Sequence, residues 1–329
     1  MTTRERINEY FNSRAFMVLS ALALVVTAVM AWAMGVKPAA SGGSGIFFTL
    51  DSELIGNGAV SMAVNVLCLL VTGGIMLAMN KVFNYVRAVT HLFVSAFFLL
   101  QLAHPASLVT FNAGTMLSLV AAVSAMPLFA AFQDKHSQRR IFLLFALATA
   151  GAMFHYGFLA LIPAFLLGFL NMGVLNLKGM LAMLFGLITP FWIVLGLGIA
   201  SPADFMAPQF RGIWHQPGDP TATLLLVLTA LTSLLGIVLA VVNLFTIINY
   251  RVQTRVYNAF FVFVLVSVII AICFDYGDVA FFLPLLNLMV AVQIAHAHTL
   301  HTTHGYRYIF ILLLIAAGIA FAVANVFMP

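Results

Sequence analysis

Long apolar runs, separated by short polar or charged turns, fill almost the whole chain. A bilayer core about 30 Å thick needs roughly 20 apolar residues per helix. On that scale the pattern predicts an all-α integral membrane protein with about eleven (10–11) transmembrane helices in one polytopic domain over residues 1–329, without a soluble domain. The helices are expected at 15–35, 59–79, 88–104, 112–132, 141–154, 157–175, 180–199, 222–248, 257–274, 279–295 and 308–327.

The pattern is interrupted at Phe154-His155-Tyr156-Gly157, where the apolar run contains a polar ring and a glycine. This interruption predicts two short helices in place of one. A single tilted or re-entrant element would reverse the side of the membrane for every later helix.

The distribution of basic residues predicts the orientation. With a helix break at His155, twelve of the 14 Lys and Arg residues fall on one side, and only Lys37 and Arg211 fall on the other. Because cytoplasmic loops carry an excess of Lys and Arg, the N-terminus is expected in the cytoplasm and the C-terminus outside. The expected location is the bacterial inner (cytoplasmic) membrane, in a multi-pass arrangement.

Composition supports the membrane assignment. Apolar residues make up 64% of the chain and charged residues 7%, whereas soluble domains carry about 25% charged residues. The net charge of +5 does not indicate nucleic acid, because the basic residues orient helices. The two cysteines, Cys68 and Cys273, lie inside apolar runs and provide no disulfide framework. The lipid bilayer is therefore the first predicted partner.

Candidate catalytic carboxylates lie in the first of the two longest external loops, at about 36–58 and 200–221. Asp51 and Glu53 come shortly after two phenylalanines, so they are expected at the membrane interface. A carboxylate in such a partly apolar place has a raised pKa and can act as a general base. Alternatively, Asp51 caps a short interfacial helix.

Candidate substrate-binding residues come from the second loop and from the helix break. Arg211 is an external cation, and His215 follows it closely. Together they are suited to a phosphate or pyrophosphate. His155 joins the same external set if the topology holds. Each of these residues also has a plainer interpretation, as part of a solvated loop or as a structural hydrogen-bonding group.

Two further motifs contain residue types that can bind a metal ion. Asp275 and Asp278 form an Asp-x-x-Asp pattern that suits a divalent cation, although Asp and Gly are also common turn residues. The tract from His296 to His304 has no acidic residue or cysteine near it in sequence. No metal site is assigned, and the sequence leaves the cofactor undetermined.

The predicted spans carry no carboxylate or lysine near the membrane midplane. Polar residues do occur there, such as Asn65, Gln101, Asn243 and Asn287, and they are expected to hydrogen-bond between helices. Since coupled pumps commonly place ionisable residues in their spans, this absence disfavours a proton- or ion-coupled pump.

Part of the chain resembles a Bacteroidota-type family of polytopic membrane proteins of unknown function. The resemblance runs from residues 139–142 through Phe154-His155-Tyr156 to 162–168, Gly186 and Thr189-Pro190, roughly a third of the chain. The layout is also similar to C-type membrane glycosyltransferases, which use polyprenyl-phosphate sugars. That similarity implies Asp51 or Glu53 as the external carboxylate and Arg211 as a phosphate-holding residue.

The resulting hypothesis is an inner-membrane protein of envelope biogenesis, a glycosyltransferase or polymerase that uses a polyprenyl-phosphate-linked sugar at the external face. One alternative is a transporter or lipid flippase, which a polar cavity lined by Asn243, Asn287 and Gln293 would favour. The other is a non-catalytic membrane partner of an envelope complex.

Overall fold

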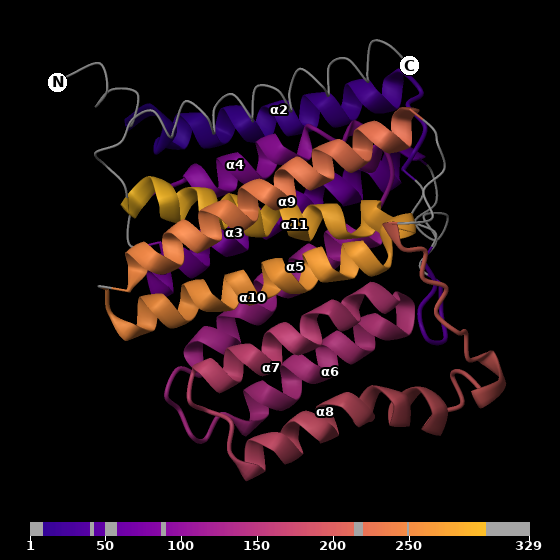
Figure 1. The fold of residues 1–329 in the computed structure, drawn as a ribbon. Helices are drawn as coiled ribbons and strands as arrows, with labels where there is room; N and C mark the ends of the chain where they lie inside the picture. Colours follow the sequence, from indigo (N-terminus) through magenta and orange to yellow (C-terminus); the bar gives the residue numbers. More distant parts are fainter. Residues whose placement is uncertain are drawn as a thin grey trace.

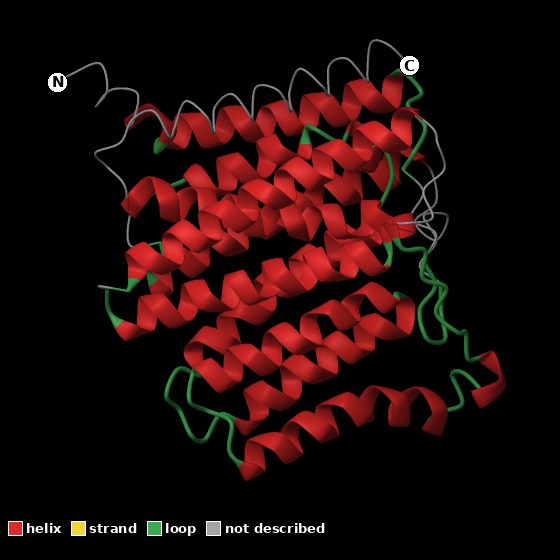
Figure 2. Cartoon of the chain, in the orientation of Figure 1, coloured by secondary structure: helices red, strands yellow, loops and turns green. Residues whose placement is uncertain are grey.

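The computed structural model is a bundle of α-helices joined by loops and short 3-10 turns (Figures 1 and 2). It describes residues 9–39, 43–49, 58–86, 90–213, 220–248 and 250–300. Its α-helices are α2 (Arg14–Ala33), α3 (Gly58–Phe83), α4 (Leu92–Gln101), α5 (Ala113–Ala130), α6 (Gln138–Phe154), α7 (Leu161–Asn171), α8 (Leu177–Gly196), α9 (Pro220–Ile247), α10 (Val252–Phe274) and α11 (Val279–Leu300).

The structure confirms the predicted class, a multi-pass helical membrane protein. Within the described residues, seven helices are long and apolar enough to cross a membrane, namely α2, α3, α5, α8, α9, α10 and α11. Ten of the expected intervals contain a described helix, and the eleventh, 308–327, lies outside the described residues.

Two helices are shorter than the apolar pattern predicts. The α4 helix has 10 residues, because it begins only after the Thr90 hydroxyl accepts the Leu92 N–H and ends before a 3-10 turn at Pro105. The α7 helix has 11 residues, because a 3-10 turn over Tyr156–Ala160 precedes it. Proline without an N–H and tight 3-10 turns both limit helix length.

The predicted break at His155 is confirmed. The α6 helix ends at Phe154, and His155 is extended with φ −159° and ψ 122°. Its Nδ1 atom accepts the N–H of Gly157 at 3.0 Å and so caps the 3-10 turn that leads into α7. A side chain that satisfies an orphan donor at a helix start stabilises the break locally.

The α11 helix lies inside the bundle, in contact with α4, α5, α9 and α10 (Figure 1). The most apolar stretch of α11 is entirely buried inside the bundle, whereas only 17% of the corresponding stretch of α8 is buried. The α8 helix packs on α6 at the edge of the bundle, and its Gly186 lies close to the Phe142 carbonyl. A helix that is apolar all round is suited either to a protein core or to lipid. The α11 helix is of the first kind and the α8 helix is of the second.

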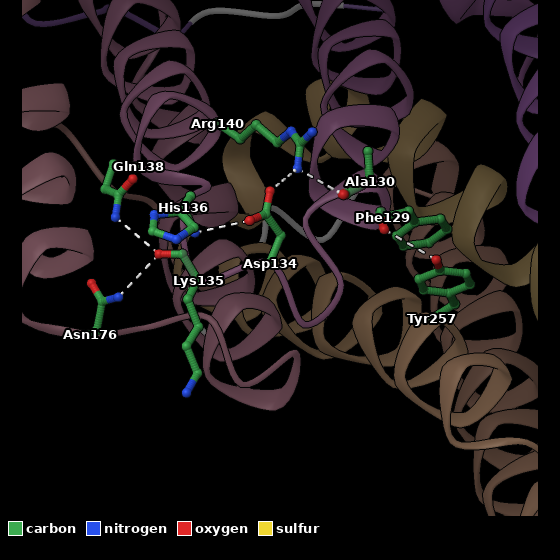
Figure 3. Close-up of polar contacts among 9 residues, drawn as sticks. All are labelled: Phe129, Ala130, Asp134, Lys135, His136, Gln138, Arg140, Asn176 and Tyr257. Atoms are coloured by element: carbon green, nitrogen blue, oxygen red, sulfur yellow. Dashed lines mark hydrogen bonds and ion pairs between the residues drawn. The ribbon is translucent and has the colours of Figure 1, made fainter.

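One end of the bundle is named here the His298 end. There His298 Nε2 lies 3.0 Å from Asn12 Nδ2, which connects α11 to the start of α2. The turn between α5 and α6 is also at this end, with Arg140 on Asp134 at 2.9 Å and on the Ala130 carbonyl (Figure 3). The described basic residues predicted to be cytoplasmic lie at helix ends on this side: Arg14, Lys81, Lys135, Arg139, Arg140, Lys178, Arg251 and Arg255.

The opposite end, named the His155 end, contains the α6–α7 break and the α10–α11 turn. His104 lies between α4 and α5, and burial lowers its pKa to about 4. Because the folded protein favours neutral His104, folding stability is expected to fall by about 3 kcal/mol as pH drops from 6.5 towards 4.

Thermal unfolding in detergent between pH 4 and 7 measures this dependence. His104→Gln is expected to make the curve less steep in that window, and His136→Gln, at an exposed turn, is the control. A wild-type curve that is already flat would show that His104 does not titrate with folding.

Candidate functional site

The first of the two long loops docks onto the end of α6. The Ile46 N–H donates to the Ala152 carbonyl, and the Phe47 and Phe48 N–H groups donate to the Met153 carbonyl. Ile46 and Phe47 are buried. Backbone hydrogen bonds therefore hold residues 46–48 against the end of α6.

The second long loop reaches the same place. The Met206 N–H donates to the Ile46 carbonyl at 3.0 Å, and the Tyr156 hydroxyl donates to the Met206 carbonyl. Further along, the Arg211 N–H donates to Asp275 Oδ1 at 3.2 Å, and the Gly277 N–H donates to the Arg211 carbonyl at 2.9 Å. Both loops and the α10–α11 turn thus meet around the helix break.

At the centre of this junction, His155 from the helix break faces Asp278 from the turn before α11. Their Nε2 and Oδ2 atoms are 2.6 Å apart, and the side chains are 3% and 6% exposed. The imidazole stacks on the Phe281 ring, with centroids 3.5 Å apart and planes within 6°. A buried charge is stable only when it is paired, so the two residues depend on each other.

The hydrogen bonds of His155 define its proton position. Since Nδ1 accepts from Gly157, the proton of a neutral ring belongs on Nε2, towards Asp278. The Nε2–H is close to Oδ2 but poorly aligned with it, so the contact is an electrostatic pair more than a directional hydrogen bond. Asp278 Oδ1 has no hydrogen-bond partner among the described residues.

The pair is covered by backbone. A Cβ at Gly43 would lie 2.1 Å from His155 Nε2 and 2.4 Å from Asp278 Oδ2. Only glycine fits a backbone that approaches side chains this closely. The segment 43–49 therefore closes the site on one side.

Asp275 lies one turn away from Asp278, at the end of α10. Desolvation raises the pKa of its carboxyl group, and the hydrogen bond from the Arg211 backbone opposes that shift. The negative charge of Asp278 raises the same pKa further, and His155 lowers it. Charges at Asp275, Asp278 and His155 therefore influence one another.

The Arg211 side chain runs along this turn. A Cβ at Gly277 would lie 2.8 Å from Arg211 Cβ and 3.3 Å from its Cδ. The guanidinium group is thus carried by a side chain packed over the turn between the two carboxylates. It makes no ion pair in the described structure.

Of the predicted substrate-binding residues, His155 and Arg211 come together at this site. The third, His215, and both predicted catalytic carboxylates, Asp51 and Glu53, lie outside the described residues. Asp204 is elsewhere, in an exposed capping box with Ser201. From the sequence, Asp278 was interpreted only as a turn residue or a candidate cation ligand, and it was not paired with His155.

The described residues contain no group of three His, Cys, Asp or Glu side chains placed to hold a metal ion. Asp275 and Asp278 are directed differently, one to the Arg211 N–H and the other to His155. In the described part of the histidine tract, His298 contacts Asn12 and His296 lies beside Tyr85.

The intramembrane amides behave as predicted, since they hydrogen-bond between elements. Asn65 donates to the Ser107 carbonyl, and Asn287 contacts Gln101 Oε1 at 3.3 Å. Asn243 donates to Gln293 Oε1 at 2.9 Å. These three contacts connect α3, α4, α9 and α11 with their neighbours.

Comparison with known proteins adds no relative. No family model matches the chain, and neither a curated protein nor a solved structure matches it.

Proposed function

We propose that this protein is a bacterial inner-membrane enzyme of envelope biogenesis that transfers a sugar from a polyprenyl-phosphate carrier at the external face. The observation that supports this most is the buried His155–Asp278 pair, with one carboxylate oxygen free of described partners. Buried, coupled ionisable groups are typical of sites that move protons.

In the proposed reaction Asp278 is the general base. Its Oδ1 takes the proton of an acceptor hydroxyl, whose oxygen then attacks the anomeric carbon of the sugar. The bond between that carbon and the phosphate oxygen breaks, and the polyprenyl phosphate leaves with the electron pair. General base catalysis of this kind contributes about 10²–10⁴-fold.

His155 serves this reaction as a positioning residue. Gly157 occupies its Nδ1, and Asp278 faces its Nε2, so neither nitrogen is available to an acceptor. Its Nε2 side instead faces Asp278 Oδ2 and fixes the orientation of the carboxylate. Stacking on Phe281 keeps the imidazole in one plane.

Arg211 is proposed to bind the donor phosphate. Its side chain packs against the turn that carries the carboxylates, and arginine binds phosphate oxygens through two parallel N–H groups. Because Gly43 covers the pair, the acceptor reaches Asp278 only when the segment around Gly43 moves. Asp51 and Glu53 remain proposed as additional carboxylates of the site.

The transporter or flippase alternative would need an open polar cavity between helices. Asn243, Gln293 and Asn287, which would line its cavity, are engaged in hydrogen bonds between helices. A non-catalytic role in an envelope complex would not need a buried carboxylate oxygen that has no partner among the described residues.

Phosphate recognition by Arg211 is testable with purified protein in nanodiscs. Undecaprenyl phosphate is expected to bind at least tenfold more weakly to Arg211→Ala than to wild type, because a hydrogen bond to a charged group contributes about 1.5–3 kcal/mol. Lys37→Ala is the matched control, as Lys37 is the other basic residue on this side of the predicted topology, and it should bind normally. Equal binding of undecaprenol and its phosphate would contradict the proposed donor site.

A further inference from the structure

A second polar site lies inside the bundle, away from the His155 end. Asn243 on α9, Asn258 on α10 and Gln293 on α11 are each completely buried. Asn243 Nδ2 donates to Gln293 Oε1 at 2.9 Å, and Gln293 Nε2 donates to Asn258 Oδ1 at 3.2 Å. The three side chains form a continuous amide chain across three helices.

The two ends of this amide chain have no partners among the described residues. Asn243 Oδ1 and Asn258 Nδ2 are buried and make no hydrogen bond within the described structure. Reversing all three amide groups would reverse the direction of the chain and still leave one acceptor and one donor at its ends. The missing hydrogen bonds therefore follow from how the three side chains are arranged, whichever way their amide oxygen and nitrogen atoms are assigned.

A third unpartnered atom lies one helical turn away. His296 is 1% exposed, three residues beyond Gln293 on α11, and its Nε2 has no partner among the described residues. Residues three apart on a helix lie on the same side. The His296 ring is 6.3 Å from the Tyr85 ring, which is itself 5.2 Å from the ring of Phe261 on α10.

Each unpartnered buried polar group costs about 1–3 kcal/mol. Native proteins avoid that cost mainly by binding ordered water, which makes 2–4 hydrogen bonds in a polar site. The Asn243, Asn258, Gln293 and His296 side chains include no carboxylate or other permanent charge that would offset the dehydration of an ion. The chemistry of the site therefore fits a small neutral molecule that both donates and accepts.

We infer that Asn243, Asn258, Gln293 and His296 form an internal water-binding site between α9, α10 and α11. Water satisfies the free donor of Asn258, the free acceptor of Asn243 and the Nε2 atom of His296. This site is independent of the proposed sugar transfer, because it shares no residue with the His155 end.

X-ray radiolytic labelling in ¹⁸O water tests this inference, because bound water is converted to hydroxyl radicals at its own location. In nanodisc-embedded protein, Tyr85, Phe261 and His296 should incorporate ¹⁸O although they are at most 1% exposed. Phe145 and Phe165, equally buried in α6 and α7, are the internal controls and should stay unlabelled.

Variants refine the test. Asn258→Leu removes one end of the amide chain and is expected to lower labelling at Tyr85 and Phe261 at least fivefold. Gln101→Leu, in the separate pair with Asn287, should leave that labelling unchanged. Labelling of the three reporters no higher than at Phe145 and Phe165 in the wild type would overturn the inference, whether or not the variants fold.

Discussion

Replacing His155 with leucine is expected to lower the free energy of unfolding by about 3–5 kcal/mol, since it leaves Asp278 buried without its partner. Asp278→Leu is expected to cost less, because a neutral imidazole is less costly to bury without a partner than a carboxylate is. The double variant should recover much of the loss, because two apolar side chains leave no buried charge.

Reversible unfolding in mixed micelles at pH 7 measures all four proteins of this cycle. His136→Leu, at an exposed turn of the His298 end, serves as the histidine control. Additive effects, with no recovery in the double variant, would show that the two side chains are not energetically coupled.

Gly114→Ala is expected to be the most damaging small substitution near the site. A Cβ at this position would lie 1.9 Å from the Phe281 carbonyl oxygen, in the backbone of α11. Because backbone cannot rotate away, α5 and α11 must separate, and overpacking of this kind costs about 1–3 kcal/mol or more. The shift should also displace Phe281 from His155.

Gly74→Ala provides the matched control. Gly74 is also inside a helix, and no atom lies within 4 Å of an added Cβ there. Alanine is favoured over glycine in helices by about 0.5–1 kcal/mol, so this variant should melt at the same temperature as wild type or higher. Equal melting temperatures for the two alanine variants would contradict the close approach of α5 to α11.

Apolar periodicity predicted most of the helices, because a bilayer demands long apolar segments with internally satisfied backbones. It also located the break at His155, where a polar ring interrupts an apolar run. The shorter α4 and α7 were not predicted, since their ends depend on a threonine cap and on 3-10 turns. Such local hydrogen bonds leave little trace in hydropathy.

The site was predicted only in part for a related reason. Charge counting placed His155 and Arg211 on one side of the membrane, and the structure brings them to one end together with Asp275 and Asp278. Sequence alone did not pair His155 with Asp278, because that contact depends on how the α6–α7 break meets the α10–α11 turn. The close approach of Gly43 to the pair was not predicted either, since the sequence does not distinguish a glycine required by close packing from other loop glycines.

The most direct test of the proposed transfer is the envelope glycan profile of a deletion strain complemented with Asp278→Asn. Asp275→Asn is the comparison, because it keeps an oxygen for the Arg211 N–H and changes a carboxylate only one turn away. At matched amounts of protein in the membrane, wild type and Asp275→Asn should restore a glycan that Asp278→Asn does not. Full restoration by Asp278→Asn, or a deletion strain with all glycans intact, would contradict the account.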